Sequence, residues 1–406
     1  WVLGDAPGRH EWMLFAAVHL RSEASVRRVA SLTREWARKH QEKAKRACVA
    51  LAAIGSDIAL MHLAHVSDTT RFDALRKHAS ALVLEAAESR GLTSEELGDR
   101  TVPDVGLDRD GTMTLSYGAR RFVVSLDETL RPVVSLLVDG KPASPSHSLP
   151  RPSKSDDAEG VKVAREQFER LRADLEAVAD RERRRLESAM ANERSWTVTE
   201  FRTFFVDHPL LVHVARRLVW VVTHDGVARA FRVAEDRTFA DANDATLDLV
   251  DGTVRMAHPA SDPDLVGVWS RLLADYEILQ PFEQLARATA TIASSERGAK
   301  DLSRVAGIVV PARKTMGILE SRGYRREDPG YVGAFVRDLR ARDGSVCTVR
   351  LPLAPGFDIE GLSSAQDQTT QPATLVDSKG EPAAFGVLDA VSFSELVRDA
   401  EALRSR

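Results

Sequence analysis

The side chains best suited to chemistry gather between residues 196 and 285, where helical and strand patterns alternate. Histidine can act as a general acid or base, arginine can clamp an anion, and carboxylates can exchange protons. The candidate ligand or partner contacts in this region are His208, Arg216, Arg217, His258, Asp275, Tyr276 and Glu277. They would form a functional pocket only if the fold brings them together.

The spacing of these residues matches no familiar catalytic arrangement. Arg216 and Arg217 lie near Trp220 where a helical pattern becomes a strand pattern, so they either clamp an anion or form ordinary salt bridges. Asp275 and Glu277 are two positions apart and would point in different directions on a helix. The chain also lacks the GxSxG, P-loop, HExxH, CxxC and GxGxxG motifs. We therefore assign no catalytic residue.

Metal and cofactor sites find no better support. His62 and His65 are three positions apart on a predicted helix and share a face, but no nearby cysteine or carboxylate completes a ligand set. Cys48 and Cys347 match no metal or disulfide spacing. We assign no metal ligand and no cofactor, and such low cysteine usage is typical of a reducing cytoplasm.

Length and composition indicate a globular chain of more than one domain. The chain has 406 residues, of which 43% are hydrophobic and 29% charged, and its formal net charge is -4. An acidic balance argues against a protein that mainly grips phosphate backbones. The sequence contains no apolar run of the ~18–20 residues that a membrane helix needs, and no signal peptide. We expect a cytoplasmic protein without a membrane partner, and interpret the start at Trp1 as that of a C-terminal portion of a longer protein.

Residues 1–98 carry apolar side chains at helical spacing of three and four. Ala47, Leu51 and Ile54 share one face of a predicted helix, and Gly55-Ser56-Asp57 ends it and begins the next. Short helix pairs in series predict HEAT-like repeats, with a plain helical bundle as the alternative.

The helical pattern then gives way to strands and a linker. Residues 99–140 alternate apolar and polar side chains in three runs, which predicts an antiparallel β-meander. Residues 141–157 contain four prolines and five serines, which predicts a linker or a strap without regular structure. The string LPRPSK within it is either a docking peptide or a strap across the protein's own surface.

The remaining chain predicts a mixed α+β region. A long charged helix is expected from about residue 158 to 190, followed by a helix that Thr197 and Glu200 begin as a capping box. Hairpins are expected at Asp225-Gly226 and Asp343-Gly344. We expect Pro281 to end the helix LVGVWSRLLADYEIL. In the last helix, we expect Ser392 to act as the N-cap and Glu395 to complete its capping box.

Several strings, taken together and in order, resemble the bacterial MolR-like family. They include GSDIALMHLAHV, SLPRPSKSDD, EFRTFFVDHPLLVHVARRLVWVV, FRVAEDRTFAD and ADYEILQPFEQL, and the resemblance extends from about residue 45 to 345. It implies a WGR-associated domain of unknown function at residues 158–345, preceded by HEAT-like repeats. The residue pattern of 346–406 itself predicts β segments and a terminal helix. Because relatives of that family are often encoded near MoxR-type AAA+ ATPases and von Willebrand A-domain proteins, it also implies a protein partner of that kind.

The leading hypothesis is therefore a non-enzymatic protein-interaction or regulatory scaffold in a bacterial ATPase-associated system. The first alternative is a novel enzyme or small-ligand-binding domain centred on residues 196–285. The second is a DNA-binding transcriptional regulator, which the acidic balance disfavours.

Overall fold

The computed structural model describes residues 12–20, 22–127, 129–362 and 365–404. It is an α+β protein with antiparallel sheets and a helical N-terminal region, as the sequence predicts. The chain forms two compact units. Unit 1 consists of Trp1–Arg184 and Arg202–Ala215, and unit 2 of Arg185–Phe201 and Arg216–Arg406.

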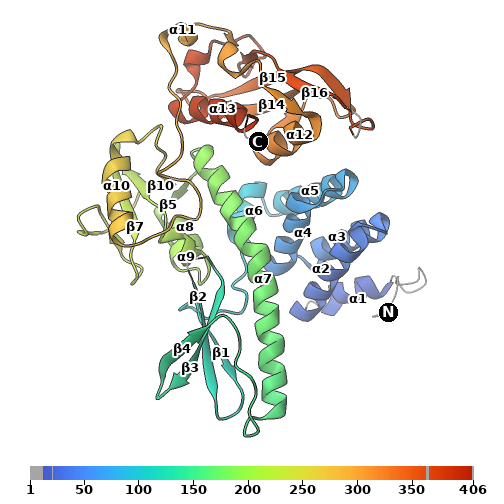
Figure 1. The fold of residues 1–406 in the computed structure, drawn as a ribbon, viewed down its shortest axis with the longest axis vertical. Helices are drawn as coiled ribbons and strands as arrows, with labels where there is room; N and C mark the ends of the chain where they lie inside the picture. Colours follow the sequence, from blue (N-terminus) through green and yellow to red (C-terminus); the bar gives the residue numbers. More distant parts are fainter. Residues whose placement is uncertain (1–11, 21, 128, 363–364, 405–406) are drawn as a thin grey trace. The chain divides into compact units, whose positions relative to one another are not determined.

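Unit 1 begins with consecutive helices that pack in pairs, α2 against α3 and α4 against α5 (Figure 1). Ala47, Leu51 and Ile54 are buried on one face of α3, as predicted. Gly55 ends α3 in the left-handed conformation at a φ of 65°, and Ser56 occupies the N-cap position of α4. The helices are α1 (Trp12–Leu20), α2 (Glu23–Ala37), α3 (Gln41–Ile54), α4 (Asp57–Thr69), α5 (Asp73–Glu88) and α6 (Ser94–Arg100).

A four-stranded antiparallel sheet follows, in the order β1-β2-β3-β4. Its strands are β1 (Met113–Ser116), β2 (Arg121–Leu126), β3 (Pro132–Val138) and β4 (Lys141–Ser146). The prediction of three strands and an irregular segment from residue 141 was wrong for β4. Pro142 and Pro145 are tolerated because β4 is an edge strand, where a missing N–H faces away from the ladder.

Residues 147–157 then lie across the sheet's own side chains. The Tyr117 hydroxyl donates a hydrogen bond to the Pro150 carbonyl at 3.2 Å, and Arg120 donates to the Arg151 carbonyl at 3.1 Å. Arg120 also pairs with Asp156, and this hydrogen bond, with one from the Ser153 N–H, holds the pKa of that carboxyl well below its usual range. These contacts fix the path of the segment that leads into the next helix, α7 (Ala158–Ala191).

The last part of unit 1 is a return segment with η2 (Arg202–Val206), a π-helical turn, and α9 (Leu211–Ala215). It packs close to the turn before β1. A Cβ atom added to Gly111 would lie 2.8 Å from His213 Nε2 and 2.9 Å from the Pro209 carbonyl oxygen. Only glycine fits there, and the φ of 77° at Gly111 also favours glycine, which has no Cβ to clash in the left-handed region.

The first sheet of unit 2 has six strands in the order β5-β10-β6-β7-β8-β9. One face packs on an aromatic cluster, in which Phe201 of α8 contacts Trp220, Phe231 and Phe239. The Thr197–Glu200 capping box and the Asp225-Gly226 hairpin are confirmed. The elements are β5 (Ser195–Thr197), α8 (Val198–Phe201), β6 (Trp220–His224), β7 (Val227–Val233), β8 (Phe239–Ala240), β9 (Thr246–Leu247) and β10 (Thr253–Met256).

The opposite face of this sheet packs against α10 (Pro263–Asp275), which ends before the predicted position. The Ile278 N–H donates to the Leu273 carbonyl, and the Glu277 N–H donates to the Ala274 carbonyl. These two bonds form a Schellman motif, with Glu277 in the left-handed conformation at a φ of 55°. The interpretation of Pro281 as the helix stop was therefore wrong.

The second sheet of unit 2 has seven strands and a hydrophobic core of its own. Phe393, Leu396 and Val397 of α13 pack against its buried strand residues. Its strands are β11 (Asp301–Leu302), β12 (Val309–Pro311), β13 (Arg325–Arg326), β14 (Tyr331–Arg340), β15 (Val346–Asp358), β16 (Asp367–Thr370) and β17 (Ala373–Val376). The helical elements here are α11 (Ser294–Arg297), η3 (Ser303–Val305), α12 (Ala312–Ser321), η4 (Phe385–Val387) and α13 (Ala390–Ala402).

The last helix begins earlier than predicted. Asp389, not Ser392, is the N-cap of α13, and its side chain accepts a hydrogen bond from the Ser392 N–H at 2.6 Å. The Ser392 hydroxyl instead accepts from the Arg340 N–H at 3.0 Å. Glu395 is thereby released from the predicted capping role and points into unit 2.

Several turns share one device, in which an aspartate accepts N–H groups two and four residues ahead. Asp127 and Asp241 do so with their Oδ1 atoms, as does Asp377. The residue three positions after each aspartate has a positive φ, and these residues are Leu130, Asp244 and Gly380. The aspartate therefore supplies the local hydrogen bonds that hold a left-handed residue in place.

The Schellman motif at the end of α10 predicts a stabilising substitution. Glu277→Gly is expected to raise the free energy of unfolding by about 1 kcal/mol, because glycine adopts the left-handed conformation without the Cβ clash. Thermal or denaturant unfolding measures the change. Glu277→Ala is the matched control, since alanine removes the charge but keeps the strain. An equal gain from both variants would contradict a backbone origin.

Candidate functional site

The structure distributes the seven candidate contacts over separate surroundings. His208 belongs to unit 1, where Nε2 hydrogen-bonds the Val102 carbonyl at 3.0 Å and Nδ1 accepts the N–H groups of Leu210 and Leu211. The other six lie in unit 2. Neither of the two cavities described below is lined by more than one of the seven.

The arginine pair has local structural partners. Arg216 pairs with Glu235 at 3.3 Å, and Arg217 donates to the Leu279 carbonyl at 3.4 Å. Asp275 is exposed at the end of α10, next to the capping residues.

Tyr276 and Leu279 lie at the surface, whereas Phe282 is buried. Their exposed fractions are 50% and 65%, against 8% for Phe282. The Tyr276 hydroxyl donates to Asp244 at 2.7 Å, and Arg232 lies over its ring at 4.6 Å from the centroid.

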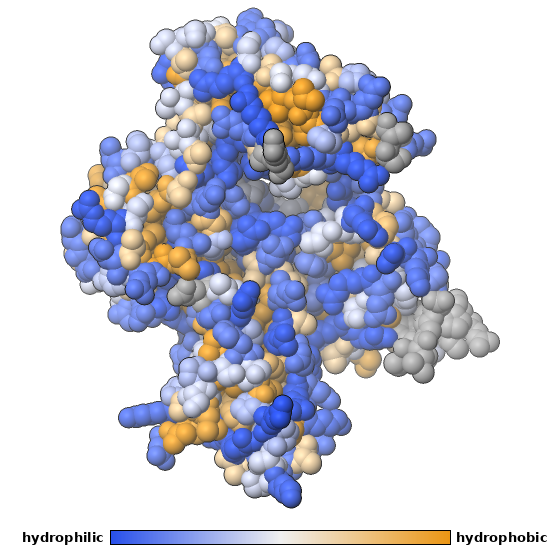
Figure 2. All heavy atoms as spheres, viewed as in Figure 1, coloured by the Kyte–Doolittle hydropathy of each residue, from blue (hydrophilic) through white to orange (hydrophobic). Residues whose placement is uncertain are grey.

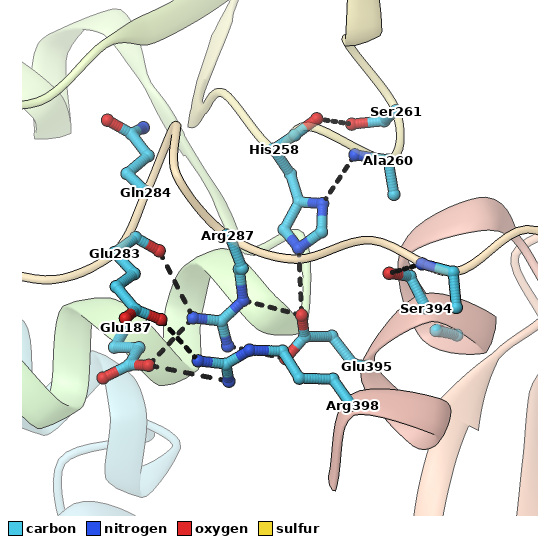
Figure 3. Close-up of polar contacts among 12 residues, drawn as sticks. Glu187, His258, Ala260, Ser261, Glu283, Gln284, Arg287, Ser394, Glu395 and Arg398 are labelled. Carbon is cyan, nitrogen blue, oxygen red and sulfur yellow. Dashed lines mark hydrogen bonds and ion pairs between the residues drawn. The ribbon is translucent and has the colours of Figure 1, made fainter. Parts of the chain in front are cut away.

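His258 is the one candidate at the centre of a buried polar cluster, shown in Figure 3. It follows β10, and its Nδ1 accepts the Ala260 N–H at 3.1 Å. Because Nδ1 accepts, Nε2 carries the proton in the neutral ring and donates it to Glu395 at 3.1 Å. Both ring nitrogens are therefore engaged.

Glu395 joins His258 to Arg287. The guanidinium donates to both carboxylate oxygens, at 2.7 and 2.6 Å, in a bidentate pair. Arg287 also reaches Glu187 at 2.8 Å, and Arg398 pairs with Glu283 at 3.2 Å beside them (Figure 3).

The charges in this cluster stabilise one another. Burial raises the pKa of the Glu395 carboxyl, but hydrogen bonds from Arg287 and His258 outweigh burial and hold the pKa well below its usual range. Burial likewise lowers the pKa of Arg287, but its hydrogen bonds to Glu395 and Glu187 raise the pKa above its ordinary value. The cluster is a satisfied structural network that joins distant segments, with no atom of His258 left to meet a substrate.

Sequence reasoning missed Arg287 and assigned Glu395 to a cap. One signal was present, because Glu395 lies four residues after Val391 and one before Leu396, within the apolar pattern of α13. A charge at a core position of an amphipathic helix indicates a buried partner. That partner lies 108 residues away along the chain, so no local pattern could name it.

Unit 1 contains a cavity of about 550 Å³, referred to here as the unit 1 pocket. Charged side chains from several segments line it, together with apolar residues. The charged residues are Glu23, Arg27, Asp57, Asp99, Arg100 and Asp104. Its other lining residues include Ser56, Val102, Pro103, Phe204 and His208.

Unit 2 contains a second cavity of about 430 Å³, referred to here as the α10 groove. It lies between α10 and the strands β7 to β9. Its apolar lining comprises Ala230, Ala242, Leu247, Leu265, Val268 and Trp269. Its polar lining comprises Arg229, Asp241, Asn243 and Asp264.

His62 is buried in unit 1, with an exposed fraction of 4%. Its Nε2 has no hydrogen-bond partner among the described residues and lies 4.0 Å from Asp174 Oδ1. Burial is the largest cause that lowers the pKa of His62, to about 3, and the charge of Arg34 adds to it. No three His, Cys, Asp or Glu residues of the described chain lie close enough together to hold a metal ion.

Comparison with known proteins bears on identity. Residues 144–324 match the family model described as a domain of unknown function, DUF4132. The chain is also 31% identical over 371 residues to the uncharacterized protein YehI of Escherichia coli (strain K12). That match covers 90% of this chain and 30% of the relative, so the chain spans under a third of the relative's length. No solved structure matches.

These findings correct the resemblance drawn from the sequence. Neither the matching family model nor the E. coli relative points to the MolR-like family or to a WGR-associated domain. The assignment of residues 158–345 to that family was therefore wrong. The described chain contains no helix long and apolar enough to cross a membrane.

The buried cluster predicts a large cost for losing one charge. Glu395→Gln is expected to lower the free energy of unfolding by about 3–5 kcal/mol, because Arg287 would keep its buried charge without a carboxylate. Denaturant unfolding measures the loss. Glu401→Gln, an exposed position on the same helix, is the matched control and should change stability by about 0.5 kcal/mol or less. Equal effects would show that the cluster does not stabilise unit 2.

His62 predicts a specific pH dependence. Its pKa is lowered from 6.5 to about 3, so the folded protein binds fewer protons than the unfolded chain between these values. Its contribution is present above pH 6.5 and is lost as the pH falls toward 3. Relative to His62→Leu, the wild type should lose roughly 2–3 kcal/mol over two pH units below 6.5. Parallel slopes for wild type and His62→Leu would contradict the assignment.

Proposed function

We propose that this chain is a non-enzymatic protein-interaction module, and that the unit 1 pocket receives a positively charged segment of a partner protein. The observation that supports this proposal is the pocket itself. It has a volume of about 550 Å³ and is lined mostly by acidic and apolar side chains. A pocket of this size is within the range of ligand-binding cavities.

The charges of the pocket favour a cation. Arg27 is already neutralised, because it pairs with Glu23 and with Asp174, each at 2.8 Å. Arg100 lies 5.2 Å from the centroid of the Phe204 ring. The carboxylates of Asp57 and Asp104 are exposed and add negative charge to the lining.

The pocket also offers uncharged contacts to a partner side chain. The Ser56 hydroxyl oxygen is buried and has no hydrogen-bond partner among the described residues. Val102 and Pro103 add apolar surface beside it. A lysine or arginine side chain combines an apolar stem with a cationic end, which suits such a lining.

We further propose that α2 to α5 form a HEAT-like array. The support is that consecutive helices pack as pairs joined by short turns, such as the Gly55-Ser56 turn. Arrays of this kind present extended surfaces to other proteins. A cytoplasmic location is part of the proposal, supported by Cys48 and Cys347 being buried free thiols.

Two earlier hypotheses are not carried forward. The enzyme hypothesis needed its candidate residues to converge, and their partners place them in different surroundings. The DNA-binding hypothesis needed a basic face, yet Arg183 and Arg184, in the arginine-rich stretch of residues 181–187, both pair with Asp180. The ATPase and A-domain partners rested on the MolR-like resemblance, which the comparisons overturn.

The proposal predicts that Asp57→Lys abolishes partner capture. Immobilised chain is exposed to bacterial lysate, and the retained proteins are quantified by mass spectrometry. Partners held through the pocket should fall about tenfold or more with Asp57→Lys, since a lysine there repels the incoming cation. Their retention by wild type should also weaken at high salt.

Asp110→Lys is the matched control, because Asp110 is an exposed carboxylate of unit 1 outside the pocket. It makes the same charge change and should retain the wild-type partners. Thermal unfolding of both variants checks that the fold is kept. Retention of the same proteins by Asp57→Lys would show that the pocket is not the binding site.

A further inference from the structure

We infer that the α10 groove of unit 2 is a docking site for an amphipathic helix of a partner protein. This inference uses a different unit and different residues from the unit 1 pocket, so it does not rest on the function proposed above. It is carried by an incompletely covered sheet face, by an unpaired carboxylate at its rim, and by the shape that these features leave.

The groove exists because one helix cannot cover the whole sheet. Six strands with spacings of about 4.8 Å span roughly 24 Å, whereas a helix is about 10–12 Å wide. Trp269, Leu272 and Leu273 of α10 pack over β6, around Val219 and Val221. The neighbouring strands β7 to β9 are therefore not covered by α10 on this face.

The side chains on the uncovered strands are small. Ala230 of β7 is directly opposite Val221 of β6 and shares its face of the sheet, and Ala242 follows β8. Val268 projects from α10 beside them with an exposed fraction of 53%. Figure 2 shows apolar side chains gathered over the region of α10 and β7, at the left of the view.

Polar contacts hold α10 at a set distance from the strands. Tyr276, just after α10, donates to Asp244 in the turn between β8 and β9 at 2.7 Å. Arg232 of β7 donates to the same carboxylate at 2.8 Å, and its guanidinium covers the Tyr276 ring. The groove is therefore formed before any partner arrives, which lowers the cost of binding.

The rim carries a charge without a partner. Asp264, in the first turn of α10, is exposed, and its side chain forms no hydrogen bond or ion pair with any residue in the described part of the chain. Arg229 precedes Ala230 on β7, so strand alternation turns its side chain to the opposite face of the sheet. A complementary partner therefore presents a basic residue to Asp264 beside an apolar stripe.

An amphipathic helix fits these features better than an extended strand. The free edge of the sheet at this end is β9, which has only two residues, Thr246 and Leu247, and offers few backbone hydrogen bonds. A second helix laid beside α10 would cover the remaining strands and complete the layer on this face. Its apolar residues at positions i, i+3, i+4 and i+7 would enter the groove.

The test uses a display library of helix-forming peptides of about 16 residues, long enough to hold a helix. Wild-type full chain is the bait. Enriched peptides should show an apolar stripe at helical spacing flanked by a basic residue. Val268→Glu should weaken their binding by about tenfold or more, because it places a charge within the apolar contact. Val227→Glu, an equally exposed valine of β7 outside the groove, should leave binding unchanged.

A charge-reversal pair gives the second readout. Asp264→Lys should weaken the enriched peptide, and replacing the peptide's basic residue with glutamate should restore binding to that variant. Enrichment of extended peptides, or of none sensitive to Val268→Glu, would overturn the inference. The Asp57→Lys variant should bind the enriched peptides normally, so failure of either proposal is distinguishable from failure of the other.

Discussion

A buried carboxylate must be matched by positive charge or hydrogen bonds, and this condition at Glu395 organises unit 2. Removing a carboxylate from water costs several kcal/mol, and only well-placed partners recover that cost. Glu395 receives His258 from the loop after β10 and the guanidinium of Arg287. Arg287 in turn contacts Glu187, near the end of α7. One helix position thereby ties together three segments that are remote in sequence.

The same helix carries a second buried carboxylate four residues later. Asp399 accepts hydrogen bonds from Arg337 of β14 and from Arg322, each at 2.6 Å. Burial raises the pKa of Asp399, although both arginines oppose that shift. Glu395 thus connects α13 to the loop after β10, and Asp399 connects the same side of the helix to β14. Rotation of α13 by one residue would remove both carboxylates from their partners, so the two charges fix its register where apolar packing alone would tolerate alternatives.

What the sequence could predict follows from how local each constraint is. The Thr197–Glu200 box and the Asp225-Gly226 hairpin depend on contacts within a few residues, and both were predicted correctly. The left-handed residue of the turn at Gly380 can be predicted, because glycine favours that conformation. In the equivalent turns Leu130 and Asp244 adopt the left-handed conformation, and their residue types do not predict it. The end of α10 is a similar case, since Glu277 occupies a position that usually carries glycine. Pro281 was the visible signal for a helix end, but the hydrogen bonds of the Schellman motif already end α10 at Asp275.

The candidate site was harder to predict because architecture and function compete for the same residue types. His258 and the arginine pair were singled out for their chemistry, and the fold uses them for packing, ion pairing and helix ends. The surfaces left for binding are defined instead by what remains uncovered or unpaired. Ala230 lines a groove because it is small and because α10 lies over the neighbouring strand. Asp264 matters because no described residue neutralises it. Whether a residue is uncovered or unpaired depends on how two elements pack against each other. It can therefore be determined from the positions of the sheet and its covering helix, and not from the sequence alone.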